Sequence, residues 1–224
     1  MAYSGLLIFH ILMGTTGLFS GIGAMIIKKG TKHHYTVGNV FFVSMLLMAS
    51  SGVYIAASRS ISLSVMGGLF TFYLVASSWM TVWRKKKEIG FPEMAITLFA
   101  FGIGLLGYSF GLEANASTTG LKDGEAAAPY FVFGTFAILG GISDIRMMIK
   151  GGYSGTQRLV RHLWRMCIAL LITAISIFLG NTQVFSEEIR QSQVLFVPVI
   201  LILASTLYWL FRVKLSKRFK WKAI

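Results

Sequence analysis

Seven long apolar segments are the feature of this sequence that most constrains its fold. A helix needs about 20 apolar residues to cross the hydrocarbon core of a bilayer, and each segment reaches that length. The runs are unbroken and lack the alternation of a membrane β-barrel strand. They predict an all-α, polytopic membrane helical bundle with seven transmembrane helices, at about residues 5–27, 35–57, 62–83, 92–112, 129–149, 160–181 and 193–213. Because these segments use nearly the whole chain, we expect residues 1–224 to form a single integral membrane domain.

The distribution of basic residues predicts the orientation of the bundle. If the N-terminus lies outside, 18 of the 21 Lys and Arg residues fall on the cytoplasmic side, and only Arg59, Lys122 and Arg190 fall outside. This asymmetry follows the positive-inside rule. We therefore expect a protein of the bacterial inner membrane, with its N-terminus outside and its C-terminus in the cytoplasm. The net charge of +13 is then explained by topology. We expect the partners of the protein to be the bilayer and the anionic lipids of the inner leaflet, and no nucleic acid.

The longest connection is the outer one, at about residues 113–128. Its content of Gly, Ser, Thr and Asn predicts an irregular loop. It also contains a glycosylation sequon, Asn115-Ala116-Ser117, which would matter only in a eukaryotic lumen.

Glycines recur at helical spacing in two of the segments. The first segment carries Gly14, Gly17 and Gly21, and the fourth carries Gly104, Gly107 and Gly111. Small residues allow helix backbones to approach closely in lipid. We expect these faces to pack against other helices, either within the chain or between copies in a homo-oligomer. The alternative is that the glycine face of the first segment makes room for a flat ligand beside His10.

Ionisable residues inside the spans are the first candidates for function. An ionised side chain at the centre of a membrane helix costs about 2.5–3.5 kcal/mol, so such residues are rarely incidental. His10 lies near the outer end of the first segment and His34 at the inner start of the second. The rise between them is about 25 Å, so the two cannot share a ligand atom. The cytoplasmic third of the membrane collects a larger set: His34, Asp144, Arg146, Arg161, His162 and Arg165.

This inner set fits a haem site. His34 and His162, on different helices, can serve as the two axial ligands of a b-type haem. Gly38 lies one turn after His34 and leaves space beside the ring, while Arg161 and Arg165 can pair with the propionates. His33 would replace His34 if that side chain faces lipid or solvent, and His10 is a more distant candidate. This interpretation predicts a role in electron transfer or redox sensing, with a quinone or another redox partner.

Two other interpretations stay open. His34, His162 and Asp144 would form a zinc site with an open water position, as in a metal-dependent membrane hydrolase acting on a lipid. Alternatively, the histidines cap or snorkel, Asp144 is neutralised by an arginine, and the protein is a non-catalytic transporter or sensor component. Residues two apart on a helix do not face each other. We therefore expect Asp144 to pair with Arg165 rather than Arg146, joining the fifth and sixth helices beside His162.

Two stretches, Lys29–Gly38 and Arg161–Ala169, together with His10 and Gly14, resemble a bacterial family of predicted multi-span membrane proteins, domain of unknown function 2306. That family implies no activity. The helix-borne histidines are also loosely similar to those of cytochrome b561-type proteins, which hold two haems between paired histidines. This chain has too few outer histidines for a second such pair. The seven-helix layout is similar to membrane zinc hydrolases of the ceramidase and progestin-receptor type, whose His-x3-His pair is absent here.

Overall fold

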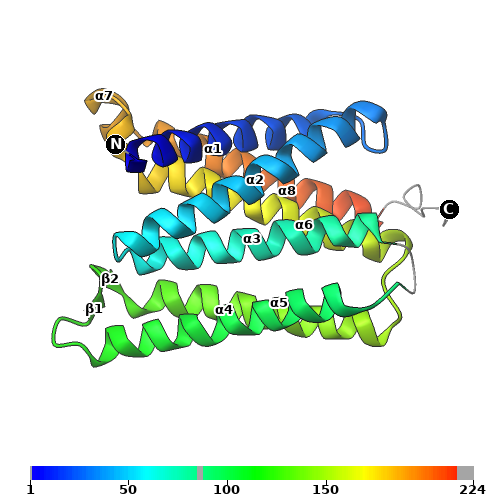
Figure 1. Ribbon diagram of the computed structural model, residues 1–224. Helices are drawn as coiled ribbons and strands as arrows, with labels where there is room; N and C mark the ends of the chain where they lie inside the picture. Colours follow the sequence, from blue (N-terminus) through cyan, green and yellow to red (C-terminus); the bar gives the residue numbers. More distant parts are fainter. Residues whose placement is uncertain (1, 85–87, 216–224) are drawn as a thin grey trace.

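The computed structural model describes residues 2–84 and 88–215 of this chain. Within those residues, seven helices are long and apolar enough to cross a membrane, which confirms the predicted all-α bundle of seven apolar helices. They are α1 Ala2–Ile26, α2 Lys32–Ser58, α3 Ser62–Trp83, α4 Phe91–Ala116, α5 Ala127–Ile149, α6 Gly155–Ile175 and α8 Phe196–Leu215. Figure 1 shows them side by side as one elongated helical bundle.

Short elements connect α6 to α8. A π-helical turn, η1 Ser176–Gly180, continues α6 and is followed by a 3-10 turn, η2 Thr182–Val184. The five-residue helix α7 Glu187–Gln191 and the 3-10 turn η3 Gln193–Leu195 then lead into α8. The apolar pattern did not predict α7, because it is short, polar and exposed.

The helix boundaries differ from the predicted ones mainly where polar residues extend a helix beyond its apolar part. Helix α6 begins at Gly155, five residues before the predicted start at about residue 160. Helix α4 runs on to Ala116, four residues past the predicted end at about residue 112. Its first turn is fixed by Glu93, whose carboxylate accepts a hydrogen bond from the backbone N–H of Gly90 at 2.8 Å. This is half of a capping box.

The outer connection between α4 and α5 is more regular than predicted. Strands β1 Leu121–Lys122 and β2 Glu125–Ala126 form a hairpin, with Lys122 paired to Glu125. The two turn residues, Asp123 and Gly124, both have positive φ angles of 52° and 83°. An Asp-Gly pair is favoured in this kind of two-residue turn because both positions need positive φ. The irregular-loop prediction was therefore wrong for the centre of this segment.

The hairpin is tied to the start of α3 by Asp123. Its carboxylate accepts hydrogen bonds from the backbone N–H of Ser62 at 3.3 Å and from the Ser62 hydroxyl. The hydroxyl bond, followed by the backbone bond, lowers the pKa of Asp123 below its usual value. A carboxylate at a helix N-terminus is also favoured by the helix dipole.

The bundle has two chemically different ends. Figure 1 shows the start of α1, the β1–β2 hairpin and α7 at one end, and the ends of α3, α5 and α8 at the other. We call these the hairpin end and the basic end. The basic end is defined by the described cations Lys28, Lys29, Lys32, Arg84, Arg146, Lys150, Arg158, Arg161, Arg165, Arg212 and Lys214.

Helices α4 and α5 pack mainly on each other, and their closest helix packing against the rest of the bundle is with α3. This close pairing depends on glycine. A Cβ atom added to Gly107 would lie 2.9 Å from the Gly134 Cα and 2.9 Å from the Tyr130 carbonyl oxygen. No side chain fits there without moving a backbone, so the packing role predicted for the α4 glycines is confirmed.

The glycines of α1 also pack within the chain. A Cβ atom on Gly17 would lie 2.9 Å from the Met45 sulfur, and one on Gly21 would lie 2.7 Å from Leu170. They let α1 lie against α2 and α6. The outward faces of the bundle are instead covered by large apolar side chains such as Ile11, Leu105 and Leu201, as a lipid environment requires.

Candidate functional site

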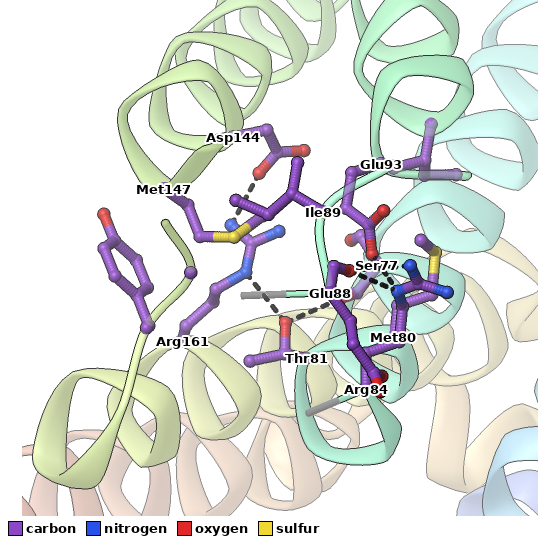
Figure 2. Close-up of a pocket in the computed structure, with 13 residues that line it drawn as sticks. Ser77, Met80, Thr81, Arg84, Glu88, Ile89, Glu93, Asp144, Met147 and Arg161 are labelled. Carbon is purple, nitrogen blue, oxygen red and sulfur yellow. Dashed lines mark hydrogen bonds and ion pairs between the residues drawn. The ribbon is translucent and has the colours of Figure 1, made fainter. Parts of the chain in front are cut away.

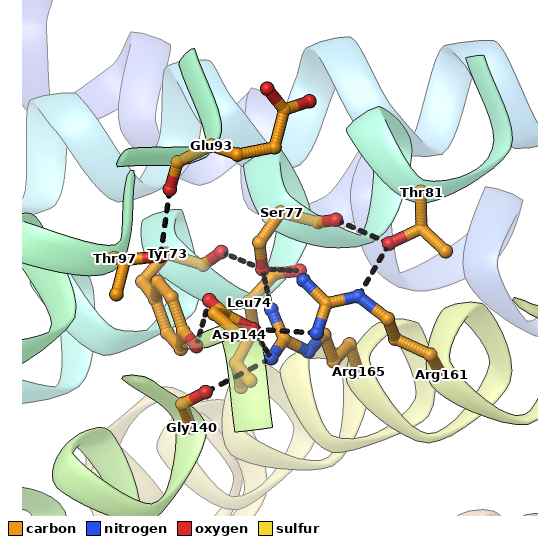
Figure 3. A network of polar contacts seen from close by, with 10 residues as sticks. All are labelled: Tyr73, Leu74, Ser77, Thr81, Glu93, Thr97, Gly140, Asp144, Arg161 and Arg165. Carbon is orange, nitrogen blue, oxygen red and sulfur yellow. Dashed lines mark hydrogen bonds and ion pairs between the residues drawn. The ribbon is translucent and has the colours of Figure 1, made fainter. Parts of the chain in front are cut away.

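A buried polar cluster joins α3, α5 and α6 near the basic end. At its centre, Asp144 on α5 is 1% exposed. Its Oδ1 atom accepts hydrogen bonds from Arg161 and Arg165 of α6, each at 2.5 Å. Its Oδ2 atom accepts the phenolic O–H of Tyr73 on α3 at 2.8 Å. The predicted Asp144–Arg165 pair is confirmed, and the second arginine and the phenol are additions that the sequence did not indicate (Figure 3).

Small polar side chains on α3 hold the two guanidinium groups in place. Ser77 accepts a hydrogen bond from Arg165, and Thr81 accepts one from Arg161 Nε at 2.8 Å. Each hydroxyl donates its own hydrogen to a backbone carbonyl of α3, one turn earlier. Since Tyr73, Ser77 and Thr81 are four residues apart, they share one face of α3. This spacing is a sequence signal of a polar face on α3, although it does not show which residues that face meets.

Gly140 on α5 makes the approach of Tyr73 feasible. A Cβ atom at this position would lie 2.7 Å from the Tyr73 hydroxyl oxygen. The Gly140 carbonyl oxygen also accepts a hydrogen bond from Arg165 Nη2 at 3.4 Å. A glycine is therefore required for the approach of Tyr73, whereas the bond to Arg165 uses only the backbone of this turn.

A small cavity of about 40 Å³ adjoins the cluster between α3, α4, α5 and α6 (Figure 2). Its inner wall is formed by Ser77, Asp144 and Arg161, and its outer part by Arg84 and Glu93. Arg84 and Glu93 form an ion pair at 2.5 Å, in which the Glu93 side chain is 7% exposed. The cavity thus leads from the basic end to the buried aspartate.

His162 lies on a different side of α6 from the two arginines. Its Nδ1 atom is 3.0 Å from the Ser78 hydroxyl oxygen on α3, and that hydroxyl donates to the His162 carbonyl oxygen at 2.9 Å. Because the serine hydrogen is used for the carbonyl, the serine oxygen is left to accept a hydrogen from Nδ1. This arrangement leaves Nε2 of His162 as the nitrogen with a free lone pair.

His34, in the first turn of α2, is not fully hydrogen-bonded. Its Nδ1 atom is buried and has no hydrogen-bond partner among the described residues. Its ring packs edge-on against Tyr35, with 6.3 Å between the ring centroids. His34 and His162 are close enough to interact electrostatically. Neither histidine has a printed contact with the Asp144 cluster, so the predicted inner set is divided between two environments.

The other predicted site residues lie elsewhere. His10 is near the hairpin end, where its Nδ1 atom is 2.9 Å from the Met48 carbonyl oxygen and 3.2 Å from the Ser51 hydroxyl of α2. His33 and Arg146 are exposed. A Cβ atom on Gly38 would meet no atom within 4 Å, so this position borders open space.

The predicted zinc ligands are not gathered into one group. Across the part of the chain that the structure describes, no three His, Cys, Asp or Glu side chains are placed to hold a metal ion. Both carboxylate oxygens of Asp144 are occupied by arginines and a phenol. The carboxylate thus links α5 to α3 and α6 through these bonds.

Comparison with known proteins adds no family. No protein-family model, curated protein or solved structure matches this chain. Function must therefore be inferred from the residues themselves.

Proposed function

We propose that this chain is a multi-pass protein of the bacterial inner membrane that binds one haem b between His34 and His162. Its N-terminus lies outside and its C-terminus in the cytoplasm, and its role is electron transfer or redox sensing. The orientation rests on the basic residues, which gather at the end of the bundle opposite the hairpin. The loose similarity of the helix-borne histidines to those of cytochrome b561-type proteins is consistent with haem binding, whereas the resemblance to domain of unknown function 2306 implies no activity.

The contact between His162 and Ser78 is the observation that carries the haem proposal. A histidine that binds a metal usually donates its other ring N–H to a fixed acceptor, which sets the tautomer and the ring orientation. Ser78 provides that acceptor for Nδ1 of His162 at 3.0 Å. Nε2 of His162 is then the unprotonated ring nitrogen, which is the form that binds a metal.

His34 supplies the second ligand in this proposal. Its buried Nδ1 atom lacks a partner among the described side chains and backbone groups, and a buried polar atom without a bond costs about 1–3 kcal/mol. A bound group that engages the His34 ring would offset part of that cost. Bound haem b would supply a one-electron couple, whose potential depends on its axial ligands and the surrounding dielectric.

The propionates need a different partner from the one predicted. Arg161 and Arg165 are both committed to Asp144. Lys28 and Lys32 shortly precede His34 in the sequence and are exposed at the basic end. We propose these lysines as the propionate partners, and a quinone or a redox protein as the electron partner. We favour haem over zinc because the haem site leaves the bonds of Asp144 intact.

An absorption spectrum of the purified protein tests the proposal. The expected result is a Soret band that shifts on reduction and is abolished or weakened by His34→Ala and by His162→Ala. His33→Ala is the matched control, because it alters the exposed neighbour on the same turn of α2. His10→Ala should also have little effect, since it lies near the other end. If the protein is colourless when purified from cells grown with added haem, haem binding is refuted.

A further inference from the structure

An open groove runs along the seam between α1 and α2 on an exposed face of the bundle. It has a volume of about 540 Å³, and its walls include Thr16, Phe19, Gly23 and Ile27 of α1 with Val37 and Val40 of α2. This volume lies within the range of about 300–1,000 Å³ that small-molecule sites occupy. Phe19 is 69% exposed and Val40 is 44% exposed, so the described part of the chain leaves the groove uncovered.

The groove has the length and direction of one acyl chain. Its α1 wall extends from Thr15 to Ile27, a rise of about 18 Å at about 1.5 Å per residue. One leaflet contributes half of the bilayer's hydrocarbon core, which is about 15 Å. The groove therefore spans roughly one leaflet, and it ends at Ile27, next to the basic end.

Two lysines stand at the basic end of the groove. Lys28 directly follows Ile27, Lys32 begins α2 shortly before Val37, and both lysines are exposed. The chain has no Asp or Glu before Glu88. Neither lysine forms a salt bridge with a described residue. This end of the groove thus carries positive charge that no carboxylate of α1 or α2 balances.

We propose that the groove binds one anionic phospholipid from the leaflet that meets the basic end. One acyl chain lies along Phe19, Gly23 and Val37, and the phosphate accepts hydrogen bonds from the ammonium groups of Lys28 and Lys32. Lipid tails are as apolar as the groove, so the selectivity comes from the charge of the head group. An ammonium group has three donors, so these lysines can bind a phosphate and a haem propionate together.

Charge complementarity favours a lipid over a second copy of the chain. Copies inserted in one membrane share one orientation, so a neighbouring copy would bring its own Lys28 and Lys32 to the same end of the groove. Like charges repel one another, whereas a lipid phosphate is attracted. The groove is therefore better matched to an anionic lipid than to a symmetric helix contact.

Native mass spectrometry of the full chain, purified and stripped of lipid, tests the proposal with two probes. Phosphatidylglycerol and phosphatidylcholine with identical acyl chains differ only in the head group. Each lysine at the surface favours an anionic lipid by about a factor of five. We therefore expect one phosphatidylglycerol to bind at least about tenfold more tightly than phosphatidylcholine. Equal affinities overturn the proposal.

A head group without chains distinguishes a lipid site from a phosphate site. Glycerol phosphate carries the anionic group but cannot occupy the groove, so an excess of it should not displace phosphatidylglycerol. Displacement would show that a free phosphate is sufficient, and the groove would then have no role.

Matched glycine variants assign the acyl chain to the groove. A Cβ atom on Gly23 would lie 3.4 Å from Val37 Cγ1, and the rest of a leucine side chain would fill the groove, so Gly23→Leu should lose the bound lipid. Gly102→Leu adds the same side chain to α4, where a Cβ atom meets no atom within 4 Å, and it should keep the lipid. If Gly23→Leu fails to fold, Thr16→Leu fills the groove from an exposed position. A filled groove that retains phosphatidylglycerol contradicts the assignment.

Matched charge variants assign the phosphate to the two lysines. The double variant Lys28→Gln with Lys32→Gln should bind the two lipids with affinities that agree within about twofold. Arg146→Gln with Lys150→Gln removes two exposed charges at the end of α5 and should leave the preference unchanged. An equal loss in both double variants would assign the preference to the whole basic end and refute the site.

The lipid site can be tested separately from the haem site. His34→Ala should lose the Soret band and keep phosphatidylglycerol, whereas Gly23→Leu should lose phosphatidylglycerol and keep the Soret band. A wild-type protein that is colourless but binds phosphatidylglycerol selectively would refute haem binding and support the groove. A coloured protein without lipid selectivity would do the reverse.

Discussion

Replacing Asp144 by Asn would separate a structural role of the polar cluster from a chemical one. The substitution keeps the shape of the side chain but removes the one carboxylate among the described residues that touches Arg161 and Arg165. Two guanidinium groups that are almost fully buried are then left without their counter-charge. Breaking a buried ion pair by removing one partner costs about 3–5 kcal/mol. For a chain of this size, that corresponds to a fall of about 6–20 °C in melting temperature.

The double and triple variants give the sharper measurement. Adding Arg165→Gln to Asp144→Asn should recover only part of the loss, because Arg161 stays charged and buried. Adding Arg161→Gln as well should recover most of it, since the whole network is then neutral and can still form hydrogen bonds. Melting temperatures of the four proteins in the same detergent provide the assay. Arg146→Gln is the control: it alters an exposed arginine on the same helix and should shift stability by less than about 0.5 kcal/mol.

A different outcome would refute this reasoning. If Asp144→Asn melts at the wild-type temperature but loses the Soret band or an activity, Asp144 acts as a ligand or proton carrier. If the triple variant is no more stable than Asp144→Asn, the loss does not come from the unpaired charges.

Three further predictions concern other parts of the bundle. Gly140→Ala should destabilise the protein by about 1–3 kcal/mol in thermal unfolding, because its Cβ displaces the Tyr73 hydroxyl from Asp144; Gly102→Ala, where a Cβ meets no atom within 4 Å, should be neutral. Burial lowers the pKa of Lys29 to about 8, so an amine-reactive reagent at pH 8 should label it ahead of exposed lysines, as peptide mass spectrometry would show. Between pH 8 and about 10.4, the Lys29 amine binds more protons in the unfolded chain than in the folded one. The contribution of Lys29 to the free energy of unfolding therefore rises with pH across that window. Lys29→Met should flatten this rise. Cysteines placed at 114–126 should react with an impermeant reagent in intact cells, whereas cysteines at 151–157 should react only after lysis; the reverse pattern would invert the proposed topology.

The amino-acid sequence was enough to predict the helices and the position of each polar residue along them. A stretch of about 20 apolar residues has one stable conformation in lipid, because every backbone N–H and C=O must be satisfied within the helix. The position of a residue along such a helix also fixes its depth. These two facts were sufficient to predict the Asp144–Arg165 pair. The Asp-Gly turn of the hairpin was equally visible in the sequence, at Asp123 and Gly124, and its omission was a missed local signal.

Which helix faces meet depends on tertiary packing and could not be predicted from the sequence. Lipid is as apolar as the interior of a membrane protein, so no hydrophobic difference turns a particular helix face inward. The rotation of each helix follows instead from close packing at glycine and from buried polar bonds. For this reason the sequence could not show that Tyr73, Ser77 and Thr81 face Asp144, or that one aspartate serves two arginines. The same packing separated His162 from that cluster and placed it against Ser78, which divided one predicted site into two.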